Sequence, residues 1–124
     1  MAIPLALIVE DDVDLATIFS EALKAADFKT EMVQDGQKAL DLLAEMVPAV
    51  VVLDLHLPSV SGDEILKHIR ADERLAKTRV IVATADPNTA QILEDDADLV
   101  LIKPISFRQL RDMASRLALT ISRQ

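Results

Sequence analysis

Residues 49–62 read Ala49-Val50-Val51-Val52-Leu53-Asp54-Leu55-His56-Leu57-Pro58-Ser59-Val60-Ser61-Gly62, and this stretch decides the fold. Its first part is an apolar, mostly β-branched run without polar alternation, which is typical of a strand buried on both faces in a parallel sheet. The run ends at one carboxylate, Asp54, and Pro58 and Gly62 mark a loop after it. Because open α/β sheets place their chemistry at the carboxyl ends of strands, Asp54 is the first candidate for a functional residue.

Four other short apolar runs resemble this one, and each run is followed by a stretch with helical spacing of apolar residues. The predicted strands cover residues 5–9, 28–33, 50–53, 80–83 and 99–102. Strands and helices alternate strictly, and the chain shows no internal repeat or low-complexity segment. This alternation predicts an α/β fold, in which one doubly wound parallel sheet carries helices on both faces and the crossovers are right-handed.

Polar residues at the predicted helix starts support these boundaries. Asp35 is expected to cap the second helix, which carries apolar residues as far as Met46, and Asp86 with Pro87 begins the fourth. Ser61 and Ser106 each begin a capping box, which Glu64 and Gln109 complete. The fourth helix is expected to be weak and mobile, because acids at its C-terminus oppose the helix dipole. These acids are Glu94, Asp95 and Asp96.

The composition limits the classes of function. A length of 124 residues predicts one domain over residues 1–124, and no output domain is expected after its last helix. Thirteen basic and 21 acidic residues give a net charge of −8, which argues against direct binding of nucleic acid. No cysteine is present, which excludes a disulfide scaffold and a zinc–thiolate site. Without a signal peptide or an apolar run of about 20 residues, no membrane association and a cytoplasmic location are expected.

Reactive or charged side chains stand at the ends of four predicted strands: Glu10 and Asp11, Asp54, Thr84, and Lys103. Because the carboxyl ends of parallel strands share one edge of the sheet, these side chains are expected to meet in one crevice. Three neighbouring carboxylates repel each other, and Mg²⁺ is the cation that suits such oxygen ligands. An ammonium group and a hydroxyl beside them favour phosphoryl transfer, with Asp54 as the nucleophile.

At this point the sequence resembles the receiver domain of bacterial two-component response regulators, over essentially the whole chain. The residues that carry the resemblance are Leu7-Ile8-Val9-Glu10-Asp11-Asp12, Leu53-Asp54-Leu55-His56-Leu57-Pro58 with Gly62, Ile81-Val82-Ala83-Thr84-Ala85, and Lys103-Pro104. The resemblance implies a flavodoxin-like (βα)5 fold with strand order 2-1-3-4-5. It also implies a cis peptide bond between Lys103 and Pro104.

The resemblance further implies that Asp54 is phosphorylated by a histidine kinase or a histidine phosphotransfer protein. The implied ligands of Mg²⁺ are Glu10, Asp11, Asp54 and the backbone carbonyl of His56. Lys103 would pair with the phosphoryl group and Thr84 would move towards it. Such a chain is a switch rather than an enzyme with turnover, although its own site catalyses phosphoryl transfer and hydrolysis.

Val100 departs from the family, which usually carries Tyr or Phe three residues before the lysine. This departure leaves open a degenerate receiver that acts as a phosphorylation-independent docking module. A phosphohydrolase of the haloacid dehalogenase type would need a second acid two residues after the nucleophile, where this chain has His56, and more chain for a cap domain. A flavin carrier is disfavoured because the chain has neither Trp nor Tyr.

Three surface features complete the expectations. His56 and Asp86 are expected to flank the phosphoryl group and to tune the attack of water on it, or else to be ordinary exposed residues; His68 is expected to be exposed without a role. In receivers the fourth helix, fifth strand and fifth helix form the usual output face. Arginines on the last helix are expected to form either a solvated face or charge pairs with acids of a second copy, in a homodimer, or of a partner. The arginines are Arg108, Arg111, Arg116 and Arg123, and the acids are Glu94, Asp95, Asp96 and Asp98.

Overall fold

The computed structural model describes residues 3–93 and 95–121. Its strands are β1 (Leu5–Val9), β2 (Lys29–Val33), β3 (Val50–Asp54), β4 (Arg79–Thr84) and β5 (Leu99–Ile102). Its helices are α1 (Val13–Ala25), α2 (Gly36–Leu43), α3 (Gly62–Ala71), the 3₁₀ turn η1 (Glu73–Leu75), α4 (Pro87–Leu93) and α5 (Phe107–Ile121). The strands form one parallel sheet in the order β2-β1-β3-β4-β5, which confirms the predicted flavodoxin-like fold.

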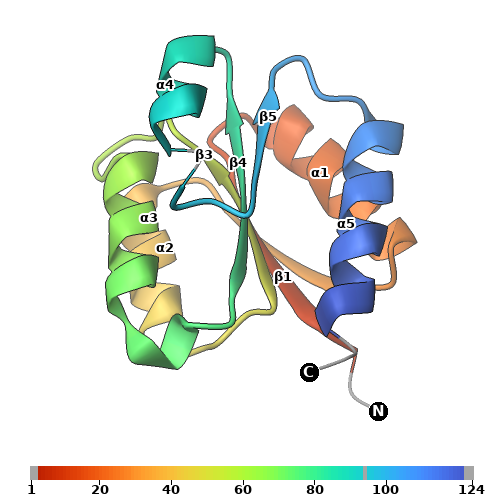
Figure 1. Ribbon diagram of the computed structural model, residues 1–124, viewed down its shortest axis with the longest axis horizontal. Coiled ribbons are helices and arrows are strands. Elements are labelled where there is room, and N and C mark those ends of the chain that lie inside the picture. The colour runs from red at the N-terminus through yellow and green to blue at the C-terminus, as the bar shows by residue number, and fades with distance from the viewer. Residues whose placement is uncertain (1–2, 94, 122–124) are drawn as a thin grey trace.

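The sheet separates two apolar cores (Figure 1). On one face, α1 and α5 pack through residues such as Phe19 and Leu110; on the other, α2 and α3 pack through residues such as Leu43 and Ile65. Successive side chains of a strand point to opposite faces, so an all-apolar strand such as β3 supplies both cores. Every residue of β3 is buried, whereas β2 at the sheet edge is mostly exposed, as its weaker pattern predicts.

The four predicted helix starts are confirmed, three of them by side-chain hydrogen bonds, whereas the capping box predicted at Ser61 does not form. Asp35 accepts the N–H groups of α2, Asp86 accepts the Asn88 N–H at the start of α4, and Ser106 accepts the Gln109 N–H in α5. Ser61 precedes α3, but its side chain makes no capping hydrogen bond, so the predicted Ser61–Glu64 capping box is wrong. Acids in the first turn of α3, including Glu64, still stabilise the helix through their interaction with the positive end of its dipole.

Some predicted boundaries also shift: β3 includes Asp54, and β4 runs from Arg79 to Thr84. Helix α2 ends at Leu43 rather than reaching Met46, because the Glu45 N–H donates to the Leu42 carbonyl, three residues back, and so leaves the α-helical pattern. Phe28 lies just before β2 and is buried in the core instead of pairing in the sheet. Of the acids expected at the end of α4, Asp95 and Asp96 follow its last residue, and Glu94 lies outside the described residues.

Asp98 joins the start of β5 to α3 and β4. Its carboxylate contacts Arg70 Nη2 at 2.9 Å and Arg79 Nη1 at 3.3 Å, and it accepts the Val80 N–H at 2.7 Å. On α5, Arg111 pairs with Asp112 of its own helix at 3.0 Å. Asp98 and Arg111 therefore already have partners within the chain, which weakens the charge-paired homodimer, while Arg123 lies outside the described residues.

Candidate functional site

The register of the sheet brings the predicted site residues to one edge. Val9 at the end of β1 pairs with Leu53, and so Glu10 and Asp54 are the next residues of neighbouring strands. Asp54 pairs with Ala83 of β4, just before Thr84. Lys103 follows β5, and its N–H donates to the Thr84 carbonyl at 2.8 Å. Residues far apart in sequence therefore line one edge because all five strands run in parallel.

Lys103 is the cation that meets the buried carboxylates. Its Nζ lies 2.9 Å from Glu10 Oε1 and 3.3 Å from Asp54 Oδ1. Glu10 is only 1% exposed and Asp54 only 3%, so both acids have lost nearly all contact with water. A buried carboxylate is costly unless it is paired and hydrogen-bonded, and one ammonium group shared between two carboxylates offsets this cost only in part. The Lys103–Pro104 peptide bond is cis, as expected.

Asp11 completes an acidic cluster with these two residues. One carboxylate oxygen each of Glu10, Asp11 and Asp54 can be chosen so that the three oxygens lie within 4.8 Å of one another. Asp11 is exposed, so the cluster is open to solvent on one side. Three carboxylate oxygens at one open position form a donor set that fits a hard divalent cation such as Mg²⁺, which keeps part of its water shell.

The electrostatic balance of the cluster leaves room for more positive charge. Burial is the main reason why the pKa of Glu10 rises from 4.5 to about 7, and the nearby charge of Asp54 adds to this effect. For Lys103, burial alone favours the neutral amine, but the hydrogen bond to Glu10 and the charge of Asp54 outweigh it, so the pKa of Lys103 lies above its ordinary value. Glu10 therefore stays partly protonated near neutral pH while no cation is bound.

We predict a distinctive pH dependence of stability in the absence of divalent cations. Between about pH 5 and pH 7, folded Glu10 keeps a proton that the unfolded chain has already released, so the free energy of unfolding is expected to fall as the pH rises. The shift corresponds to roughly 3 kcal/mol at the upper end of this window. Urea unfolding in EDTA across this pH range measures the effect.

Glu10→Gln is the control for this prediction, because glutamine keeps the shape of the side chain but cannot titrate. The fall in the free energy of unfolding between pH 5 and pH 7 should be smaller in this variant, by roughly the 3 kcal/mol assigned to Glu10. Asp35, Asp72 and Asp86 have lowered pKa values from local hydrogen bonds, so their contributions change only at lower pH. Equal slopes in wild type and Glu10→Gln would contradict the assignment.

Backbone N–H groups also orient the two buried carboxylates. The His56 N–H donates to Asp54 Oδ1 at 3.3 Å, and the Asp12 N–H donates to Glu10 Oε2 at 3.2 Å. Asp12 in turn caps α1 through its side chain, which fixes the loop after β1. The Asp12 N–H at Glu10 could not be predicted from the sequence, because backbone donors leave no mark in it.

The other predicted residues lie around the rim. Thr84 is fully buried, and its Oγ1 accepts the Asp86 N–H at 3.1 Å. His56 and Asp86 are exposed; the Thr89 hydroxyl and the Asn88 N–H hold the pKa of Asp86 below its usual value, and the charge of His56 adds to this effect. His56 and Asp86 are therefore electrostatic neighbours. His68 is exposed on α3, as predicted.

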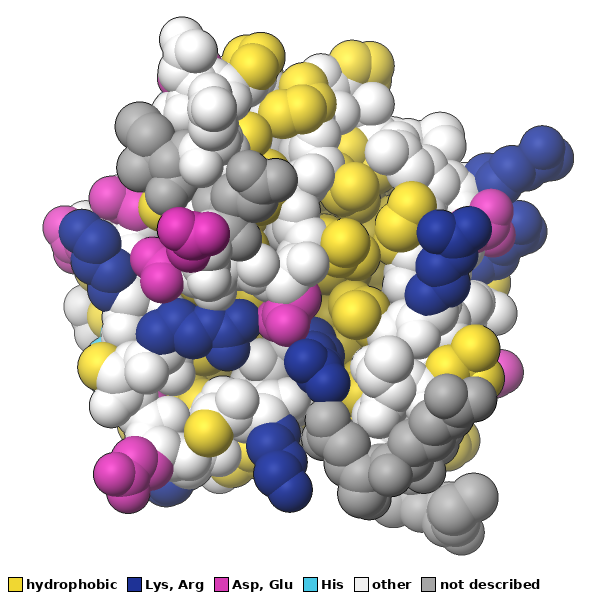
Figure 2. All heavy atoms as spheres, viewed as in Figure 1, with side chains coloured by type: hydrophobic (Ala, Val, Ile, Leu, Met, Phe, Trp, Pro, Cys, Tyr) yellow, Lys and Arg dark blue, Asp and Glu magenta, His cyan; other side chains and the backbone are white. Residues whose placement is uncertain are grey.

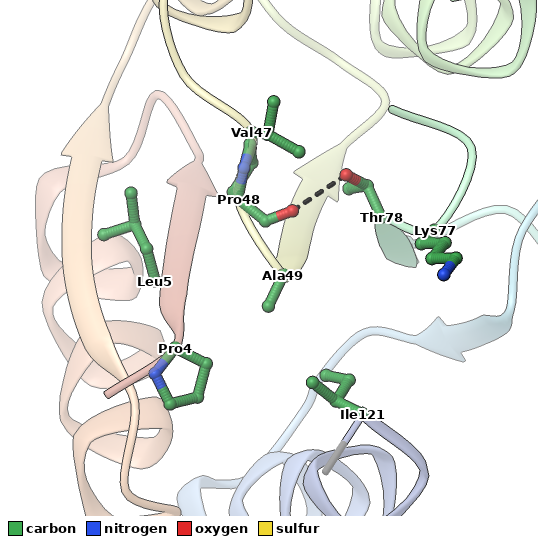
Figure 3. A pocket seen from close by; sticks show the side chains of 8 residues that line it. All are labelled: Pro4, Leu5, Val47, Pro48, Ala49, Lys77, Thr78 and Ile121. Carbon is green, nitrogen blue, oxygen red and sulfur yellow. Dashed lines mark hydrogen bonds between the residues drawn. The ribbon is translucent and has the colours of Figure 1, made fainter. Parts of the chain in front are cut away.

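A separate hollow of about 230 Å³ lies at the amino-terminal ends of the strands, opposite the acidic cluster (Figure 3). It is lined mainly by apolar side chains such as Leu5, Val47 and Ile121, with Lys77 among them. The Thr78 hydroxyl donates to the Pro48 carbonyl at 2.8 Å, which ties together the loops before β3 and β4. This hollow offers no acidic or nucleophilic cluster, so the carboxylate edge is the candidate functional site.

Comparisons with known proteins agree with this geometry. The chain matches the family model described as the response regulator receiver domain over residues 6–115. It is 31% identical over 117 residues to the sensor histidine kinase TmoS of Ectopseudomonas mendocina, covering 92% of this chain and 12% of that protein. It is 33% identical over 107 residues to the DNA-binding response regulator MtrA of Mycobacterium tuberculosis, covering 84% of this chain and 46% of that protein. The chain thus spans less than half the length of either relative.

Solved structures show the same fold. The signal receiver domain of a signal transduction histidine kinase from Syntrophus aciditrophicus superposes with a TM-score of 0.86 at 27% identity, covering 98% of this chain and 94% of that one. The chemotaxis response regulator CheY4 of Vibrio cholerae superposes with a TM-score of 0.85 at 24% identity, covering 94% and 99% of the two chains, and supports the fold alone. In the described residues, no helix has the length and apolar character needed to span a membrane.

Proposed function

This chain belongs to the response regulator receiver family, and we propose on that premise that Asp54 accepts a phosphoryl group in a reaction that requires Mg²⁺. The donor is a phosphohistidine of a histidine kinase or of a histidine phosphotransfer protein. The observation that carries the proposal is the convergence of Glu10, Asp11 and Lys103 on one buried carboxylate, Asp54, at the carboxyl edge of the sheet. Metal and ammonium charges beside a carboxylate are what phosphoryl transfer needs.

The two oxygens of Asp54 have different surroundings. Oδ1 accepts the His56 N–H and contacts Lys103 Nζ. Within the described residues no hydrogen bond reaches Oδ2, so we infer that Oδ2 is the oxygen that attacks. A bond forms between Oδ2 and phosphorus while the bond from phosphorus to the ring nitrogen of the donor breaks. The electron pair stays on that nitrogen, which takes up a proton from solvent.

The acidic cluster fits the Mg²⁺ that the family implies. Glu10, Asp11, Asp54 and the backbone carbonyl of His56 would hold the ion, which would supply positive charge to the oxygens of the phosphoryl group. The raised pKa of Glu10 supports this assignment. Without a cation, burial disfavours the ionised carboxylate, and a bound cation would stabilise that ionised form. Lys103 would then pair with the phosphoryl group from the side of β5.

Thr84 is the residue that would report phosphorylation to the rest of the molecule. Its hydroxyl oxygen accepts the Asp86 N–H, which leaves the hydroxyl hydrogen available to a phosphoryl oxygen. A movement of Thr84 towards that group would shift the chain between two conformations. Figure 2 shows apolar side chains gathered along β5 between α4 and α5, where Ile102 is 41% exposed. We infer that this face contacts the output partner or domain.

The direct test is intact mass after incubation with a small-molecule phosphodonor, with and without Mg²⁺. Addition of one phosphoryl group only in the presence of Mg²⁺ supports the proposal. No added mass with either a small donor or phosphohistidine protein would instead favour a phosphorylation-independent docking module.

His56 and Asp86 are expected to set the lifetime of the phosphorylated state. Both are exposed at the rim, and an imidazole or a carboxylate there can take a proton from the water that attacks the phosphoryl group. Replacing either by alanine should lengthen the lifetime, by about tenfold or less because the groups are solvated. The decay of phosphorylated protein, followed by mass, measures this. His68→Ala is the matched control, and unchanged lifetimes in both rim variants would refute the assignment.

A further inference from the structure

The loop between β3 and α3 is fastened to the start of α2. Ser59 Oγ donates to Asp35 Oδ1 at 3.0 Å, and the Gln37 N–H donates to Ser59 Oγ at 3.3 Å. The Gly36 N–H donates to the Pro58 carbonyl at 3.3 Å. We call this set of contacts, made by residues 35–37 and 58–59, the α2 latch. It connects two segments that are more than twenty residues apart in the sequence, since Ser59 follows Asp35 by 24 positions.

Gly36 permits the close approach of the two segments. A Cβ atom at this position would collide with the Val60 carbonyl oxygen and would lie 2.8 Å from the Val60 carbonyl carbon. Both of these are backbone atoms, which cannot move aside by a change of rotamer. Gly36 is itself buried under the loop. The contact between the loop and α2 is therefore a packed backbone contact as well as a set of hydrogen bonds.

Ser59 adopts a backbone conformation that residues other than Asn, Asp and Gly rarely adopt. Its φ is 64°, in the left-handed region, and such a conformation persists when surrounding contacts hold it. The Ser59 hydroxyl meets an ionised partner: the Lys38 N–H and the Ser59 hydroxyl keep the pKa of Asp35 below its ordinary value. A hydrogen bond to a charged acceptor is stronger than one between neutral groups, so it can hold the loop in this conformation.

The other end of the same loop contacts the site. The His56 N–H donates to Asp54 Oδ1 at 3.3 Å, and the Gly62 N–H closes the loop by donating to the Leu55 carbonyl at 3.1 Å. The loop thus has one attachment at Asp54 and one at α2. Only Leu57 separates His56 from Pro58, so movement of the latch end displaces the His56 backbone as well.

We propose that Ser59 and Asp35 are positioning residues for the Asp54 site, and that their hydrogen bond holds the His56 backbone where it binds the cation and orients Asp54. This inference rests on the proposed function, because it assigns the latch a part in Mg²⁺ binding. It also couples α2 to the site: a contact that disturbs the start of α2 would weaken cation binding. Groups that orient metal ligands typically change metal affinity by about 10–100-fold when they are removed.

Three substitutions separate the hydrogen bond from the backbone conformation. Ser59→Gly removes the hydroxyl but accepts a positive φ, and Ser59→Asn accepts a positive φ and restores a donor to Asp35. Asp35→Asn keeps an oxygen that caps α2 and removes only the charge. Asp72→Asn is the matched control, because Asp72 also caps a helical turn, at the far end of α3.

Mg²⁺ titration of the whole chain, by calorimetry or by the amide resonance of His56, is the test. We expect Ser59→Gly to bind Mg²⁺ about tenfold more weakly, Asp35→Asn to lie between it and wild type, and Ser59→Asn and Asp72→Asn to bind like wild type. The urea midpoint without Mg²⁺ should change little in Ser59→Gly. Its phosphorylation rate should be low at limiting Mg²⁺ and should recover at saturating Mg²⁺, a split that a merely structural role would not produce.

The outcomes distinguish the two proposals. Wild-type affinity for Mg²⁺ in Ser59→Gly overturns the latch and leaves the proposed function standing. Weaker binding in Ser59→Gly, with no phosphoryl incorporation in wild type, overturns the proposed function and supports the latch. A wild-type chain that does not bind Mg²⁺ overturns both.

Discussion

Asp54→Asn is expected to abolish phosphoryl incorporation while leaving the fold intact. The amide of asparagine is a far weaker nucleophile than a carboxylate. Glu10 is also buried, contacts Lys103 and accepts a backbone N–H, but it follows the neighbouring strand β1, and its pKa of about 7 leaves it partly protonated near neutral pH. Intact mass after treatment with a small phosphodonor and Mg²⁺ measures the loss.

The stability of this variant shows whether the loss is chemical. Removing the charge of Asp54 removes one cause of the raised pKa of Glu10, and Lys103 keeps Glu10 as a partner at 2.9 Å. The free energy of unfolding in EDTA is therefore expected to equal or exceed that of wild type. Asp41→Asn, an exposed change on α2, is the control that should incorporate phosphate normally. Incorporation in Asp54→Asn at the wild-type level would refute Asp54 as the acceptor.

Gly62→Ala is expected to damage both stability and phosphoryl transfer. A Cβ atom on Gly62 would collide with the Asp54 carbonyl oxygen and would lie 2.6 Å from the Leu55 Cα atom. Both are backbone atoms, so either the start of α3 or the end of β3 must move. Alanine gains up to about 1 kcal/mol of helix propensity over glycine, but less at the first helical position. Overpacking against a rigid backbone costs about 1–3 kcal/mol, so the clash decides the sign.

The movement falls on Asp54, the proposed phosphoryl acceptor. Displacement of Asp54 by a fraction of an ångström changes its alignment with Lys103 and with the donor, and misplacement of about 1 Å can cost on the order of a hundredfold in rate. We expect the rate of phosphoryl incorporation in Gly62→Ala to fall by at least about tenfold. Urea unfolding and time-resolved mass measure the two effects. Ser61→Ala is the neighbouring control, because the Ser61 side chain makes no capping bond.

The fold was predictable because it depends on patterns that repeat along the chain. Five apolar runs alternate with amphipathic stretches, and parallel pairing follows from connections of that length. The meeting of Asp54 and Lys103 was predictable because each stands at the end of a short apolar run, so that the parallel sheet must place them at one edge. The resemblance to receivers then supplied the strand order and the cis peptide bond, which the structure confirms.

The missed features depend on contacts between segments far apart in sequence. Ser61 and Glu64 had the spacing of a capping box, yet the Ser61 side chain makes no such bond, because spacing does not fix where a hydroxyl points. The acidic stretch before β5 suggests that Asp98 pairs with a second copy, but Arg70 and Arg79 contact it from α3 and β4. Long side chains find partners according to packing, which a local pattern does not contain.

Hydrophobic periodicity and the length of the connections are written along the chain, and together they specify the sheet, its helices and the groups at its carboxyl edge. How strongly these groups act on one another depends instead on packing between distant segments. Burial raises the pKa of Glu10, and the Lys103 ammonium group contacts both Glu10 and Asp54. Gly36 allows the loop after Asp54 to pack against α2. Dielectric surroundings and backbone contacts arise only when distant segments pack together, and they set the chemistry of this site.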